Sequence, residues 1–268
     1  MGTVTIDAAV AWATQPPNGD SCWWSHRLSV VRGFARYLST VDPAAQIPPT
    51  DVLPGRSHRA TPYPFSDGDI AALMEATRTL RTPLRKATYY TLVGLLAVTG
   101  MRVGEAVRLD RDDVDWHRGV VTIRDSKFNR TRQLPLHPTT MEILAAYDRR
   151  RVELCRRPDT TALFVSTAGT RLRYCSVHWT WLRLVRAAGL EPRSPTCRPR
   201  IHDLRHRFAV NTLTGWYRRG DEVHARLPLL SSYLGHVDPG STYWYLSAAP
   251  ELLELVAGRL DVASGGRS

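Results

Sequence analysis

A chain of 268 residues accommodates one or two domains, and its 43% of hydrophobic residues supply a core of ordinary size. Its apolar runs are too short to cross a bilayer, and its first residues lack the basic start and apolar stretch of a secretory signal. The net charge of +11 at pH 7 favours a polyanionic partner, with nucleic acid ahead of a membrane surface.

Two helices are expected at the start of the chain, because apolar residues recur at helical spacing over residues 6–12 and 22–38. Two helices cannot enclose a core of their own, so residues 1–41 either pack on something else or lack a part. Residues 1–50 contain three arginines and three aspartates, and the basic excess therefore lies entirely after residue 50.

A proline-rich linker is expected next, since residues 42–65 hold six of the 18 prolines. Ser66, with Asp69 three residues later, has the pattern of a helix N-terminus, and this helix should run to about Leu80. A second helix starts at Pro83 and ends at Gly100. These helices open a second domain, residues 66–268.

The rest of this domain is predicted to be mainly α-helical with a small antiparallel sheet. Residues 120–123 and 133–136 are typical of two strands around a polar turn. Further helices are expected near residues 139–153, 176–188, 202–217, 225–235 and 250–260.

Lysine is unusually rare in this chain. Of 36 basic residues only Lys86 and Lys127 are lysines. In such a chain a lysine is expected where an amine is required, because lysine loses its proton far more readily than arginine. The four cysteines form no Cys-x-x-Cys pair, so a metal site is not expected and a reducing cytoplasm is the default location.

Four segments carry candidate chemistry, in a fixed order: Thr99–Glu105, Lys127, His202–His206, and Leu234–His236 followed by Thr242–Tyr245. Together they resemble the tyrosine recombinase, or phage integrase, family over roughly residues 66 to 260. The resemblance implies a tyrosine recombinase-like catalytic domain and a site-specific integrase that cleaves and rejoins DNA through a 3′-phosphotyrosyl intermediate.

The chemistry of phosphodiester cleavage explains these residue types. Arg102 and Arg205 can hold the non-bridging phosphate oxygens through charged forks. His202, three residues before Arg205, can donate to the phosphate or take the tyrosine proton, although a histidine at a helix start can also be a simple cap. Glu105 is expected to support Arg102, and His206 is interpreted as structural.

The nucleophile is predicted to be Tyr245. Its position nine residues after His236 and the Thr-x-x-Tyr pattern favour it over Tyr243. Tyr243 and Trp244 are expected to pack against the domain. In the family His236 contacts the scissile phosphate, although a histidine after a helix can also simply interact with the helix dipole.

Lys127, in the hairpin turn, is the candidate general acid for the leaving 5′-hydroxyl. Because the covalent intermediate conserves bond energy, no ATP, metal or other cofactor is expected. The implied partner is double-stranded DNA, bound by a homotetramer on two DNA sites, with no membrane and no small-molecule substrate. Residues 251–256 would dock on a neighbouring subunit or, equally well, on their own domain.

Residues 1–41 would then be a partial DNA-clamping domain, shorter than in the family, which leaves the activity of the isolated chain open. Two other functions also remain open. A type IB topoisomerase shares the nucleophile chemistry without exchanging partners, and a non-catalytic module would only occupy DNA sites. The target sequence, and the choice among integration, transposition and dimer resolution, cannot be read from one chain.

Overall fold

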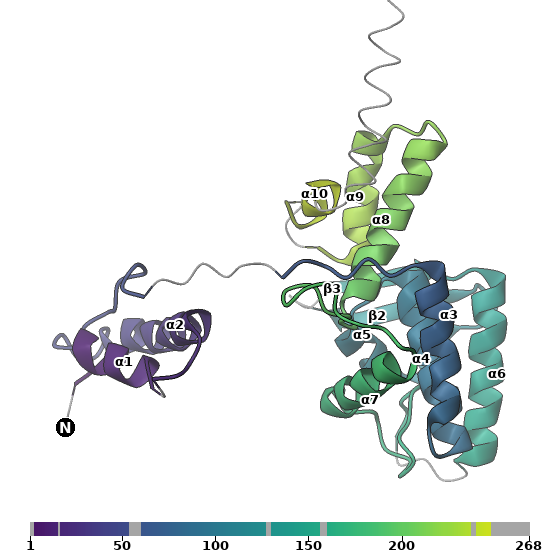
Figure 1. Cartoon of the computed structure of the whole chain (residues 1–268), viewed down its shortest axis with the longest axis horizontal. Coiled ribbons are helices and arrows are strands. Elements are labelled where there is room, and N and C mark those ends of the chain that lie inside the picture. Colours follow the sequence, from purple (N-terminus) through teal and green to yellow (C-terminus); the bar gives the residue numbers. More distant parts are fainter. Residues whose placement is uncertain are drawn as a thin grey trace, which may run out of the picture. The chain divides into compact units, whose positions relative to one another are not determined.

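The computed structural model describes residues 3–15, 17–53, 60–126, 130–155, 160–236 and 240–247 (Figure 1). The chain divides into two compact units, residues 1–60 and 61–268, and the predicted linker is shared between them. Among the described residues, no helix combines the length and apolarity needed to cross a membrane.

The first unit is a pair of helices, α1 (Ile6–Ala13) and α2 (Ser21–Leu38). Each begins at a polar residue that accepts a backbone N–H of the first turn, Thr5 for α1 and Asp20 for α2. Although two helices were not expected to enclose a core of their own, they share a small buried cluster of Ala9, Ala13 and Leu28. Both helices occur where the apolar spacing predicted them.

The second unit opens with α3 (Asp67–Ala76), whose predicted start is confirmed. The Ser66 side chain accepts the Asp69 N–H while the Asp69 carboxylate accepts the Ser66 N–H. The helix ends earlier than about Leu80, in the 3₁₀ turn η1 (Thr77–Thr79). The Thr77 and Thr79 hydroxyls donate to carbonyls three residues back, which favours this tighter turn.

Helix α4 (Pro83–Thr99) has the predicted bounds. Pro83 occupies the first turn, where a missing N–H does no harm, and Gly100 ends the helix in the left-handed region at φ 60°. Figure 1 shows α3, α4 and α6 (Pro138–Leu154) side by side.

A three-stranded antiparallel sheet, in the order β1–β2–β3, lies between α5 (Val103–Arg108) and α6 in the sequence. Its strands are β1 (Val114–Asp115), β2 (Val120–Ser126) and β3 (Arg130–Pro135), with the turn η2 (Arg111–Asp113) before them. The hairpin was predicted, but β1 was not, because two residues show no alternation. Val121 faces Leu134 in the register, and both are buried in the main core.

The remaining helices are α7 (Tyr174–Ala187), α8 (Asp203–Arg218), α9 (Val223–Leu234) and α10 (Gly240–Ser247). A second, smaller core joins α8, α9 and α10 through Ala209, Leu213, Leu230 and Tyr245. The predicted mainly helical fold with a small antiparallel sheet is confirmed. The helix expected near residues 250–260 lies outside the described residues.

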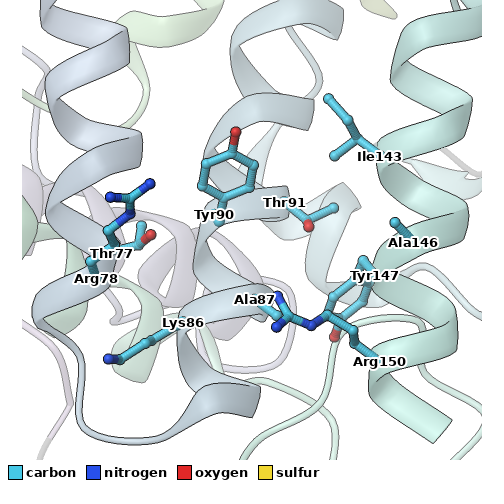
Figure 2. Close-up of a pocket in the computed structure, with 10 residues that line it drawn as sticks. All are labelled: Thr77, Arg78, Lys86, Ala87, Tyr90, Thr91, Ile143, Ala146, Tyr147 and Arg150. Atoms are coloured by element: carbon cyan, nitrogen blue, oxygen red, sulfur yellow. The ribbon is translucent and has the colours of Figure 1, made fainter. Parts of the chain in front are cut away.

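A cavity of about 420 Å³ lies between η1, α4 and α6 (Figure 2). Its lining includes Lys86, Arg78, Arg150 and Tyr90. Lys86 is near the start of α4, so it is about 20 Å along the helix from Thr99 and the motif residues that follow. The cavity is therefore separate from the predicted catalytic cluster.

Candidate active site

Arg102 is positioned by the end of α4. Gly100 turns the chain, and Arg102 then occupies the position before α5. Its Nη1 donates to Glu105 Oε1 at 2.9 Å, and its backbone N–H donates to Glu105 Oε2 at 2.8 Å. Its Nη2 donates to the Gly235 carbonyl at 3.1 Å. The side chain remains 31% exposed, so a phosphate can reach it.

Arg205 lies on the first turn of α8 and is 2% exposed. It donates to the carbonyl of Gly100 at 2.9 Å and to that of Leu234 at 2.6 Å. Burial, followed by the positive charge of Arg102, lowers the pKa of Arg205 to about 10, against the opposing effect of Tyr245. The guanidinium therefore stays charged near neutral pH.

His202 precedes α8 and is exposed. Within the described part of the chain, its side chain makes no capping hydrogen bond, so the role of a simple cap is not supported. The protein around the ring displaces water and Arg205 and Arg102 add like charge, so the pKa of His202 is lowered despite the opposing charge of Asp203. The ring is therefore neutral at pH 7 and able to accept a proton.

His236 follows the left-handed Gly235 that ends α9. Its backbone N–H donates to the Ser231 carbonyl at 2.9 Å, and its Nδ1 is 2.7 Å from Thr242 Oγ1. Its ring stacks on Tyr245 at a centroid distance of 5.9 Å. The other ring nitrogen, Nε2, has the chemistry to donate a hydrogen bond to a phosphate.

Tyr245 is 5% exposed and belongs to the α8–α10 core. Its hydroxyl lies close enough to Arg205 to raise the pKa of that guanidinium. The rings of His206 and Trp244 lie 5.3 and 5.5 Å from its ring, which agrees with a structural place for His206. Arg102, Arg205, His236 and Tyr245 thus lie in one cluster, with His202 close enough for the two arginine charges to affect its pKa.

The expected packing of Tyr243 is wrong. Its side chain is 51% exposed, whereas Thr242 and Tyr245 are buried. Residues three apart share a face of a helix, so α10 places 242 and 245 inward and turns 243 outward. Trp244 packs against the α8–α10 core as expected.

Two predicted features lie outside the described residues. Lys127 falls between Ser126, where β2 ends, and Arg130, where β3 begins. The predicted docking segment, residues 251–256, falls in the C-terminal stretch beyond residue 247. Both stay predictions.

Sequence reasoning missed Arg132, on β3. Its guanidinium donates to both carboxylate oxygens of Glu105, from Nη2 to Oε2 at 2.7 Å and from Nη1 to Oε1 at 3.1 Å. Strand alternation could have found it, because Arg132 shares a face with the buried Leu134. An arginine at an inward position of a strand calls for a buried carboxylate partner.

Glu105 is consequently a buried but charged carboxylate. Burial raises its pKa more than any other single influence, and the hydrogen bonds and charges of Arg132 and Arg102 together outweigh burial, so the pKa is lowered. The acid expected to support Arg102 therefore joins two arginines.

Residues 65–251 match the model of the phage integrase family. The chain belongs to this family. It is a tyrosine recombinase, an enzyme that cleaves and rejoins DNA at specific sites. It is 42% identical over 264 residues to a Sinorhizobium fredii protein named as an integrase/recombinase, y4rB, covering 96% of this chain and 84% of that one.

A second relative is the tyrosine recombinase XerD of Staphylococcus epidermidis, at 31% identity over 224 residues, covering 81% of this chain and 69% of XerD. Among solved structures, the XerH site-specific recombinase bound to its palindromic difH substrate aligns with a TM-score of 0.69 at 19% identity. That alignment covers 95% of this chain and 72% of the XerH chain. A lambda integrase tetramer bound to a Holliday junction aligns with a TM-score of 0.62 at 17% identity, covering 90% and 64%. These structures share the fold.

Proposed function

We propose that this recombinase cleaves DNA with Tyr245 as the nucleophile. The energy of the cleaved phosphodiester is conserved in a 3′-phosphotyrosyl ester. The main support is the place of Tyr245, whose ring stacks on His236 and whose hydroxyl lies close enough to the charged, buried guanidinium of Arg205 to raise its pKa. A phosphate bound to that guanidinium would lie next to the nucleophile.

In the forward step the Tyr245 oxygen attacks phosphorus and the bond to the 5′-oxygen breaks. His202, neutral because its pKa is lowered, accepts the phenol proton. Arg102, Arg205 and Nε2 of His236 stabilise the charge that builds on the non-bridging oxygens. Arg205 has five N–H donors, so it can bind a phosphate while keeping its bonds to the protein.

The leaving 5′-oxygen needs a proton, and we assign that donor to Lys127. Rejoining is the reverse reaction, in which a 5′-hydroxyl attacks the phosphotyrosine and releases Tyr245. Since the ester conserves the energy of the phosphodiester, the reaction needs no further energy source.

We further propose a homotetramer on two double-stranded DNA sites as the working unit. The net charge of +11 suits a DNA partner, and the lambda integrase of similar fold was solved as a tetramer on a Holliday junction. Residues 1–41 would contribute to clamping the DNA. The four free thiols suit a reducing cytoplasm. Integration of a mobile element is the expected biological outcome.

A suicide DNA substrate tests the nucleophile, because loss of the short 5′-hydroxyl fragment traps the covalent complex. Tyr245→Phe should form no covalent product while binding DNA as the wild type does. Tyr243→Phe is the matched control, an exposed tyrosine two residues away, and should cleave normally. A covalent product from Tyr245→Phe that disappears in Tyr243→Phe would overturn the assignment.

The same purified protein distinguishes a recombinase from a type IB topoisomerase and from a non-catalytic DNA-binding module. A type IB topoisomerase would relax supercoiled DNA that carries no paired recombination sites, whereas a recombinase needs its sites. A non-catalytic module would give no covalent complex with any substrate.

A further inference from the structure

Three consecutive carbonyls at the C-terminal end of α9 each accept a hydrogen bond from a different arginine. The bonds are Arg132 Nε to Tyr233 O (2.8 Å), Arg205 Nη2 to Leu234 O (2.6 Å) and Arg102 Nη2 to Gly235 O (3.1 Å). The last carbonyls of a helix have no partner within the helix, and cations are favourable there. The three arginines come from β3, from α8 and from the start of α5, so the end of α9 is tied to three separate elements.

Arg132 differs from the other two arginines. Its side chain is 11% exposed, and its guanidinium is engaged by both Glu105 oxygens and by the Tyr233 carbonyl. All three of its guanidinium nitrogens therefore already donate to protein oxygens, and the Glu105 carboxylate balances its charge. Glu105 in turn holds Arg102 through both the side chain and the backbone N–H.

We propose that Arg132 is a positioning residue for DNA cleavage, which holds Glu105 and thereby Arg102 in a fixed place relative to the end of α9. This proposal rests on the proposed function, since Arg102 is taken to bind the scissile phosphate. The chain continues from the end of α9 into His236 and then α10 with Tyr245. One guanidinium therefore links the phosphate-binding arginine to the segment that carries the nucleophile.

Gly235 supports this independently. A Cβ at this position would lie 2.8 Å from Arg132 Nη1 and 3.0 Å from Arg132 Cζ. The backbone also has φ 67°, which disfavours other residues. The glycine thus allows the guanidinium to lie directly against the turn before His236.

The charge balance at Glu105 provides a specific readout. Its charged neighbours are Arg132 from β3, Arg102 from the start of α5 and Arg205 from α8, with Tyr233 of α9 beside Arg132. Without Arg132, two of the four influences that lower the pKa of Glu105 would be lost, so this pKa would rise. Glu105 would then be protonated at higher pH, and its ionic hold on Arg102 would be lost.

The experiment measures cleavage of the suicide substrate and DNA affinity for Arg132→Gln and Arg132→Lys. Arg132→Gln should cleave roughly 10- to 100-fold more slowly near neutral pH, with unchanged affinity, because small misplacements of catalytic groups cost this much rate. The low-pH side of its pH–rate profile, the acid limb, should move to higher pH. Raising the pH should therefore recover part of the rate. Arg132→Lys should keep the wild-type acid limb, since the ammonium keeps Glu105 charged, but should remain slower than wild type because it lacks the fork.

Arg111→Gln is the matched control. Arg111 makes a comparable two-point ion pair with Asp148, at 2.8 Å for both bonds, away from the cluster. The Arg111→Gln substitution should leave the cleavage rate and the pH–rate profile unchanged. Equal effects in the two glutamine variants, or equal losses of affinity and rate in Arg132→Gln, would overturn the proposal.

Gly235→Ala covers the case in which Arg132 variants fail to fold. It should displace the Arg132 guanidinium and reproduce the slow cleavage and the shifted acid limb. Gly189→Ala controls for backbone strain, having the same φ of 67° and no described atom within 4 Å of its Cβ. A pH profile like that of Gly189→Ala would count against the proposal. If the wild type gave no covalent product, the proposed function would fail, and direct titration of Glu105 in wild type and Arg132→Gln would still decide whether Arg132 holds its charge.

Discussion

Replacing Gly100 with alanine should destabilise the second unit far more than its backbone conformation alone explains. Gly100 has φ 60°, and a Cβ there would lie 2.5 Å from Cδ1, 2.8 Å from Cγ and 3.1 Å from Cβ of Phe208. These are the atoms nearest the Phe208 backbone, so the ring cannot simply swing aside. Either Phe208 or α8, on which it lies, must shift.

Two other glycines separate the strain from the clash. Gly119 and Gly189 have φ of 65° and 67°, but an added Cβ would meet its nearest atoms at 3.7 Å in the first case and none of the described atoms within 4 Å in the second. All three alanine variants should lose roughly 1–2 kcal/mol to left-handed backbone strain. Gly100→Ala should lose about 1–3 kcal/mol more through overpacking.

The assay is thermal unfolding. For a unit of this size, the additional loss lowers the Tm by about 2–12 °C beyond the two controls. Because Arg205 donates to the Gly100 carbonyl from the same α8, cleavage should also slow more than in either control. A Tm for Gly100→Ala equal to those of Gly119→Ala and Gly189→Ala would refute the close approach of α8 to this turn.

Three further outcomes are expected. Arg102→Ala should slow cleavage roughly 10²- to 10³-fold with little loss of DNA affinity, and equal losses in both would indicate an ordinary phosphate contact. Lys127→Arg should fail to cleave normal DNA, because a guanidinium holds its proton too firmly to act as an acid. It should still cleave a substrate with sulfur at the bridging 5′ position, whose leaving group needs no proton. Near wild-type cleavage of normal DNA would show that positive charge alone suffices. Because the pKa of His202 is lowered and the neutral ring accepts the proton, wild-type cleavage should persist below the ordinary histidine value of 6.5, and His202→Ala should lose this acid limb; an unchanged limb would assign the proton to another base.

Much of the fold and the order of the site residues follows from local signals. The reciprocal bonds of Ser66 and Asp69, Pro83 in the first turn of α4 and Gly100 after its last residue were all predicted from neighbouring residues. Caps, turns and helical periods depend on residues a few positions apart, and one chain displays them completely. The motif order that indicates a tyrosine recombinase is likewise a property of the linear chain.

The tertiary structure decided which groups share an environment. Glu105 meets Arg132 across 27 positions and Arg205 reaches Gly100 across 105, distances over which no local rule operates. Tyr243 and Tyr245 differ in exposure because of the face that α10 turns to α8 and α9, not because of their spacing from His236. Burial sets the pKa of a charged group through everything packed around it, so the buried charge of Glu105 and its hold on two arginines emerge only when distant segments come together.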